Sequence, residues 1–189
     1  MRLFFTNLLA RLRRNDAGAA AVEFALIIPV MFAVYIGSIE ASSLISMDRK
    51  IQSVAAAIGD LVARSDERIA TATLQDYFLA ASGIMTPYSS QPVLQVVTSV
   101  AVSPSGVATV TWSRQYQDGA YSTSTPYSVG DEYPLPAEMT AISLGRTVIA
   151  AEASYSYTPL YGIFFNQPVN LYRSSFYMPR FGGTITITP

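Results

Sequence analysis

The chain has 189 residues, of which 50% are hydrophobic and 13% are charged, and its formal net charge is −1. It contains no cysteine and no histidine, which excludes disulfides and thiolate chemistry and removes the commonest general base and metal ligand. A near-neutral chain has no basic field for nucleic acid, so we expect no nucleic-acid partner. Without a leader and a membrane segment, about 140 residues would remain, enough for one domain with its own core.

Charge is unevenly distributed along the chain. Four arginines (Arg2, Arg11, Arg13 and Arg14) and one acidic residue, Asp16, give the first 18 residues a charge of +3 and the remainder −4. Basic residues before an apolar segment favour a cytoplasmic N-terminus. We therefore expect the chain beyond the apolar segment to lie outside the cytoplasm.

A long apolar segment follows, and it contains one carboxylate near its start, Glu23. Residues 24–39 carry no formal charge, and with residues 19–22 they approach the roughly 20 residues that a helix needs to cross a bilayer. A charge in lipid is costly, so Glu23 needs a partner. Cleavage after Gly18 would create one, because the new amino group of Ala19 would lie close to Glu23 of the same or a neighbouring subunit.

Three interpretations of this segment are open. A secretory signal peptide has small residues after the apolar run, whereas here they precede it, and Glu40 interrupts those that follow. An uncleaved single-pass anchor is also reasonable, with Glu23 reaching the interface. A type IV prepilin-like signal has a basic leader ending in glycine, here Gly18, then a glutamate at the fifth position and an aromatic residue, here Phe24. The order of these residues favours the prepilin-like interpretation.

The string RRNDAGAAAVEFALIIP, residues 13–29, resembles the N-terminus of the TadE family. Its members are TadE/TadF/TadG-like pseudopilins of the tight-adherence (Tad, or Flp type IVb) pilus system. The resemblance is dense over residues 13–64 and weaker beyond. It implies processing by a prepilin peptidase between Gly18 and Ala19, and charge pairing by Glu23 during assembly.

The resemblance further implies a pseudopilin or minor pilin that acts in assembly, initiation or decoration of a pilus. Such a protein would have an inner-membrane anchor, a cytoplasmic N-terminus and a periplasmic head, and it could enter the extracellular pilus. The implied partners are the prepilin peptidase, the major pilin and sibling pseudopilins. The alternative is an uncleaved single-pass envelope protein whose periplasmic head binds a ligand or another protein.

Helical periodicity continues beyond the apolar segment. Apolar residues recur at spacings of three, four and seven on one face: Ile51, Val54, Ile58, Leu61 and Val62. A continuous helix over residues 19–64 would run about 70 Å. Pro29 removes one hydrogen bond from it, and the kink either is accommodated by neighbouring helices or only sets the tilt of an anchor. Gly59 costs about 1 kcal/mol of helix propensity relative to alanine, unless it marks close packing.

A polar break at residues 65–68 separates this helix from a second, shorter one expected over residues 73–81. Thr73 and Asp76 resemble a capping box at its start. Gly83 is the expected stop at its end.

Beyond residue 92 the apolar pattern changes to period two, which predicts strands. Residues 93–102 and 107–113 flank a turn sequence and predict a hairpin, whereas residues 115–138 are polar and rich in glycine and proline and predict a long loop. Two more alternating segments, 147–157 and 183–188, predict strands. The fold class is therefore α+β: a long N-terminal helix packed on a small antiparallel sheet, as in pilins.

Four parts follow from these elements. We expect a basic leader over residues 1–18, a transmembrane helix over 19–46, a stalk helix over 47–64 and a periplasmic α+β head over 65–189.

Residues 155–181 are rich in aromatic side chains. These form either core and strand contacts, which we favour because aromatic residues dominate cores, or a sticky surface for subunits, membrane or glycan. The apolar run 160–165 is too short to span a bilayer but could lie against one or against a neighbouring subunit.

Catalysis would have to use carboxylates, hydroxyls or the single lysine. Ser46 and Lys50 share a helix face, but close to the expected membrane exit, where an interfacial anchor is the better interpretation. Asp131 and Glu132 fit a solvated turn better than a pair of catalytic acids. No glycine-rich phosphate loop follows a strand, and no acidic cluster has the spacing of a calcium site. We expect no enzymatic activity, cofactor, metal or small-molecule substrate.

Overall fold

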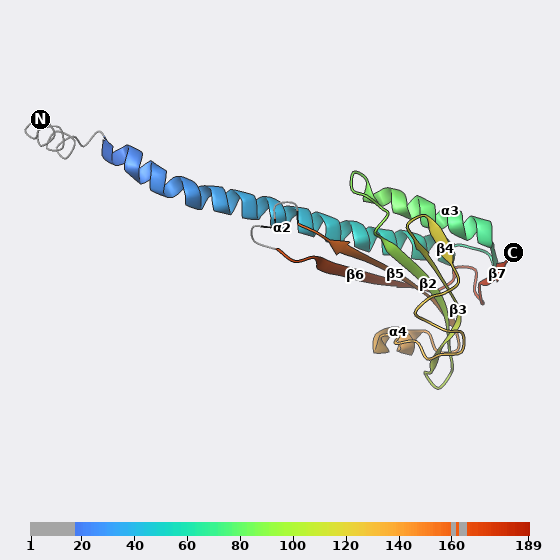
Figure 1. Cartoon of the computed structure of the whole chain (residues 1–189). Helices are drawn as coiled ribbons and strands as arrows, with labels where there is room; N and C mark the ends of the chain where they lie inside the picture. Colours follow the sequence, from blue (N-terminus) through green and yellow to red (C-terminus); the bar gives the residue numbers. More distant parts are fainter. Residues whose placement is uncertain (1–17, 160–161, 163–165) are drawn as a thin grey trace, which may run out of the picture.

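The computed structural model describes residues 18–159, 162 and 166–189. The expected leader before Gly18 and all but one residue of the apolar run 160–165 therefore lie outside the described residues. Figure 1 shows a long helix that projects from a head, with the sheet packed beside the second half of the helix. The expected α+β fold is confirmed.

The long helix α2 (Ala19–Ala63) is continuous through Pro29, and its C-cap is Arg64. Four residues of the expected apolar stripe are fully buried against the head: Ile51, Val54, Ile58 and Val62. Leu61, at the margin of the stripe, is half-buried. The periodicity therefore predicted correctly which face of this half of the helix is covered.

The second helix, α3 (Thr71–Ser82), begins two residues earlier than expected. Its N-cap is Ala70, which offers no side-chain cap, so the expected capping box of Thr73 and Asp76 is wrong. Both residues lie inside the helix, because the chain enters it directly from a short strand, β1 (Arg68–Ala70).

Gly83 is the C-cap of α3, as expected, but it does not stop the chain in a left-handed conformation. Its φ of −60° is right-handed, and the chain tightens into a 3₁₀ turn, η2 (Gly83–Met85). Lys50 of the long helix holds the end of this turn by donating hydrogen bonds to the carbonyl oxygens of Ile84 (2.8 Å) and Thr86 (2.7 Å).

The head is built on a five-stranded antiparallel sheet with the order β4-β3-β2-β5-β6. Its strands are β2 (Leu94–Val102), β3 (Ala108–Gln117), β4 (Ala120–Ser122), β5 (Thr147–Tyr157) and β6 (Val169–Tyr177). The predicted hairpin is formed by β2 and β3, and the strand predicted at 147–157 is β5, so both predictions are confirmed.

Alternation along the central strand β5 separates two apolar layers. Ile149 and Ala151 face the long helix and α3, within the larger core. Val148 and Ala150 belong to a second core on the opposite face, which is closed by α4 (Ala137–Ile142) and the segment before it. Figure 1 shows α4 on the side of the sheet away from the long helix.

The long loop predicted at 115–138 is wrong in part. Strand β3 continues to Gln117, strand β4 pairs with it, and Glu132 forms an isolated bridge with Thr109. The polar composition concealed these contacts, because they are made by the backbone.

Two further pairings are not predictable from local pattern. Strand β6 is rich in polar residues and becomes a strand by pairing with β5 over nine residue pairs. The final strand, β7 (Thr186–Thr188), is shorter than expected and pairs in parallel with β1, which begins at Arg68, the last residue of the expected polar break.

Candidate functional site: the exposed half of the long helix

The first half of the long helix is uncovered in the described structure. Every residue from 18 to 35 is exposed, and its large apolar side chains retain between 42% and 71% of their accessible surface. Among the residues that the structure describes, this helix alone is long and apolar enough to cross a membrane, and none of its most apolar window is buried. A helix that is apolar on all sides needs an apolar environment, such as a bilayer or other helices.

Glu23 lies in this exposed half, one turn after the helix begins at Ala19. A spacing of four residues places Ala19 and Glu23 on the same helix face. Gly18 precedes them as the N-cap, and it is exposed, with no atom within 4 Å of where a Cβ would stand. The Gly18–Ala19 peptide bond is thus accessible, and an amino group freed at Ala19 would lie beside the Glu23 carboxylate.

Two further residues singled out in the sequence lie in the same exposed half. Phe24, beside Glu23, keeps 62% of its surface. Pro29 has no N–H to donate to the carbonyl oxygen of Ala25, one turn earlier. In an apolar environment this carbonyl needs a donor from elsewhere or a local adjustment of the helix.

The head begins to cover the helix at Ile36, and Glu40 is only 1% exposed. The last part of the segment expected to span the membrane, residues 36–46, therefore already packs against the head. Burial raises the pKa of nearby Tyr157, and the charge of Glu40 adds to that increase. Sequence reasoning treated Glu40 only as an interruption among small residues, although a charge at the end of an apolar run is itself a boundary signal.

Ion pairs connect the head to the packed half of the helix. Arg173 of β6 lies 2.6 Å from Asp48, and Arg180 pairs with Asp60. Asp60 also lies 2.6 Å from Arg64, whose hydrogen bond is the main cause that holds the pKa of Asp60 below its ordinary value. Such partly exposed pairs contribute roughly 0–1 kcal/mol each, so they orient the head more than they stabilise it.

The residues considered for catalysis lie in the packed half of the long helix and in the segment before α4. The Lys50 amine donates hydrogen bonds to the carbonyl oxygens of Ile84 in η2 and of Thr86 after it, which links the long helix to the head. Its role as an interfacial anchor stays a prediction. Asp131 and Glu132 are both exposed, consistent with a solvated turn.

A second buried carboxylate lies inside the head. Glu152 of β5 is 5% exposed, and its Oε1 accepts hydrogen bonds from the hydroxyl groups of Tyr127 (2.8 Å) and Tyr172. Tyr133 packs on Tyr127, with 4.8 Å between ring centroids. Burial, followed by the bond to Glu152, raises the pKa of Tyr127 to about 12, and the same causes raise the pKa of Tyr172. Both hydroxyls therefore remain protonated donors, which compensates the burial of the carboxylate.

The aromatic residues of the C-terminal stretch divide between core and surface. Tyr155, Tyr157 and Tyr177 pack in the larger core, and Phe176 packs in the second. Tyr172 and Phe181 remain 53% and 67% exposed. Three others lie outside the described residues: Tyr161, Phe164 and Phe165.

These features define a class: an α+β protein in which one helix provides both a candidate membrane span and part of the core of the head. The model of the TadE family, described as TadE-like protein, matches residues 18–59. The resemblance to the TadE family is therefore confirmed over this segment of the chain. No curated protein and no solved structure matches the chain.

Proposed function

We propose that the protein is a pseudopilin or minor pilin that acts in assembly, initiation or decoration of a Tad pilus. The observation that carries this proposal is the division of one helix into an uncovered apolar half and a half that forms the core of the head. The uncovered half can rest in a bilayer before assembly and pack among neighbouring helices afterwards. The same apolar surface thus serves both states, as a subunit that leaves a membrane for a filament requires.

Topology follows from the charge distribution. Four arginines before Gly18 favour a cytoplasmic N-terminus, which would put the head in the periplasm and the anchor in the inner membrane. In this arrangement the leader is residues 1–18, and the span occupies the exposed half of the helix. The head would remain accessible to the major pilin and sibling pseudopilins.

Processing between Gly18 and Ala19 by a prepilin peptidase would convert the precursor into an assembly-competent subunit. Support comes from the exposed Gly18 at the start of the helix and from the position of Glu23 one turn later. The freed ammonium group would compensate Glu23 of the same or a neighbouring chain, which removes the cost of a lone charge in lipid. Phe24 and Pro29 would contribute to helix packing at this contact.

A structural role, without catalysis, accounts best for the remaining polar residues. Lys50 is engaged with the backbone of the head, and Glu152 is compensated by tyrosine hydroxyls. Each stabilises the head rather than facing a substrate.

The first test is the identity of the mature N-terminus. Protein extracted from membranes of cells with an active prepilin peptidase should begin at Ala19 by N-terminal sequencing and intact mass. A chain that still begins at Met1 would instead support the alternative, an uncleaved envelope protein with a ligand- or protein-binding head.

The second test addresses Glu23. We expect Glu23→Ala to be processed normally but to associate with sibling subunits about tenfold more weakly or worse, because the ammonium group of Ala19 is left uncompensated in an apolar environment. Cross-linking in membranes measures the association with sibling subunits, and the amount of pili recovered after shearing measures assembly. Glu138→Ala, at an exposed glutamate of the head, is the matched control. Equal recovery from the two variants would remove the assigned role of Glu23.

A further inference from the structure

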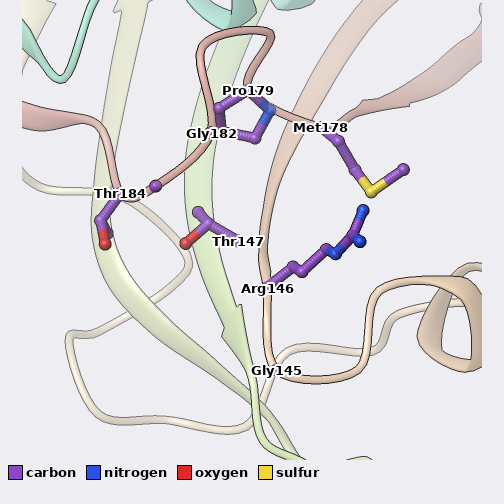
Figure 2. A pocket seen from close by; sticks show the side chains of 8 residues that line it. Gly145, Arg146, Thr147, Met178, Pro179, Gly182 and Thr184 are labelled. Atoms are coloured by element: carbon purple, nitrogen blue, oxygen red, sulfur yellow. The ribbon is translucent and has the colours of Figure 1, made fainter.

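A hollow of about 380 Å³ lies at the end of the head where the long helix finishes. Its walls come from the turn before β5, the end of β6 and the loop that leads to β7 (Figure 2). The backbone N–H of Arg180, beside the hollow, donates to the carbonyl oxygen of Ala63 at 2.9 Å. Residue 63 is about 40 Å along the helix from residue 35, so the hollow opens at the membrane-distal end of the head.

One wall carries the cationic side chain of Arg146, whose backbone is held by hydrogen bonds. The backbone of Arg146 is held on both sides, by its own N–H to the carbonyl oxygen of Ser143 and by the N–H of Val102 to its carbonyl oxygen, each at 2.9 Å. Its side chain is exposed and extends across the hollow toward Met178 in Figure 2. Among the described residues the ion pairs involve Arg64, Arg173 and Arg180, so the guanidinium of Arg146 is not engaged in one. A guanidinium is a planar fork of donors that matches a carboxylate.

The other walls add hydroxyl groups and an apolar surface. Thr147 projects from the start of β5 toward the segment of Thr184, and Met178 and Pro179 line the opposite part of the hollow (Figure 2). Gly182 has φ +69° and open space where a Cβ would stand, so a ligand can approach its backbone. Hydroxyl groups both donate and accept hydrogen bonds, which suits a ligand that carries hydroxyls of its own.

We propose that this hollow binds a single acidic sugar ring. Its carboxylate would pair with Arg146, its hydroxyls would bond to Thr147 and Thr184, and one face of the ring would rest on Met178 and Pro179. A volume of about 380 Å³ lies within the range of small-ligand sites and suits one ring. A free uronate and the terminal residue of an acidic glycan present the same chemistry. This inference goes beyond the proposed function and does not depend on assembly of the pilus.

The test is calorimetric titration of the detergent-solubilised full chain with three probes: glucuronate, glucose and acetate. We expect saturable one-to-one binding of glucuronate, and binding at least about tenfold weaker for glucose, which lacks the carboxylate, and for acetate, which lacks the ring. Arg146→Gln should weaken glucuronate binding about tenfold or more. Arg68→Gln, which removes an exposed arginine outside the hollow, should leave it unchanged.

A second variant, Thr184→Val, keeps the shape of the side chain and removes its hydroxyl, and it should weaken glucuronate binding severalfold. The inference is overturned if glucuronate shows no saturable binding or if acetate binds equally well. It is also overturned if Arg146→Gln, shown by circular dichroism to be folded, binds glucuronate as tightly as Arg68→Gln does. A glucuronate-terminated oligosaccharide separates the two sources. Tighter binding than the monosaccharide supports a glycan end, and equal binding supports the free sugar.

Discussion

Gly59 lies where the long helix packs closely against the sheet. A Cβ at this position would lie 2.7 Å from the ring of Tyr177 and 2.9 Å from the Cβ of Ala151. The interpretation of Gly59 as a mark of close packing is therefore confirmed. Glycine lowers the helix propensity at this position, but a larger residue would clash with the sheet.

Gly59→Ala should accordingly destabilise the head. Overpacking costs about 1–3 kcal/mol, which outweighs the gain of about 1 kcal/mol in helix propensity. The free energy of unfolding from denaturant titration in detergent measures the change. Gly83→Ala is the matched control, because Gly83 has a helical φ of −60° and no atom within 4 Å of a Cβ. The same loss in both variants would contradict the packing argument.

For single residues, the sequence shows which side chains are neighbours along the chain, but not which ones surround a residue after folding. Glu23 stands out in an apolar run, and local reasoning identifies it. Glu152 does not stand out, because its burial depends on Tyr127 and Tyr172, which lie 25 and 20 residues away. Only the folded sheet brings these hydroxyls to the carboxylate.

Among the elements, the pairing of β1 with β7 joins distant parts of the chain. The indole N–H of Trp112, on β3, donates to the carbonyl oxygen of Ile185 at 2.6 Å, immediately before β7. The hydroxyl of Thr71 donates to the carbonyl oxygen of Thr188 at 3.0 Å. The C-terminal segment is thus held from the sheet on one side and from the start of α3 on the other.

Trp112→Phe should loosen this contact while it retains most of the apolar packing. The buried carbonyl of Ile185 loses its donor, which should cost about 1–3 kcal/mol. Hydrogen exchange should accelerate at residues 186–188 more than in the hairpin of β2 and β3. Uniform acceleration of exchange across the sheet would instead indicate general unfolding. It would contradict a local role of the Trp112–Ile185 hydrogen bond in holding the C-terminal segment.

The elements predicted correctly are those that show their period along the chain. Strand β5 alternates between two buried faces, and the packed half of the long helix carries a clear stripe. Strand β6, at the edge of the sheet, has a mixed surface of polar and aromatic residues, and its strand conformation depends on its neighbour. Pairing across the sheet is information that local periodicity does not contain.

For the whole molecule, the exposed half of the helix and the head should be separable. Deletion of residues 1–35 removes no buried residue of the described structure. The remaining chain should fold in aqueous buffer without detergent, with the midpoint of thermal unfolding changed little, as measured by circular dichroism. Deletion through residue 58 is the control, because it removes Met47, Ile51 and Val54 from the core. A shorter deletion that fails to fold would show that the exposed half supports the head.

The order of the main elements was predictable because each has a pattern that is local in the sequence. Basic residues are followed by an apolar segment, then by a helix with one apolar face, and then by strands with alternating apolar residues. The placement of the segment before α4 over the second face of the sheet was not predictable, because Tyr127 and Tyr133 lie in a region that reads as loop. Their apolar surfaces are buried only after the sheet has formed beneath them.

The head covers the helix from Ile36 onward, which under the proposed topology limits how deeply the exposed half can enter a bilayer. Residues 18–35 can extend across about 27 Å, slightly less than the roughly 30 Å of a typical hydrocarbon core. No further uncovered helical residues lie between this exposed half and the head. A thicker bilayer therefore could not be accommodated by inserting more of the helix. Hydrophobic mismatch would have to thin the surrounding lipid or draw the head surface into the headgroup layer. Under the proposed function, lipid composition would therefore affect how readily the subunit leaves the membrane.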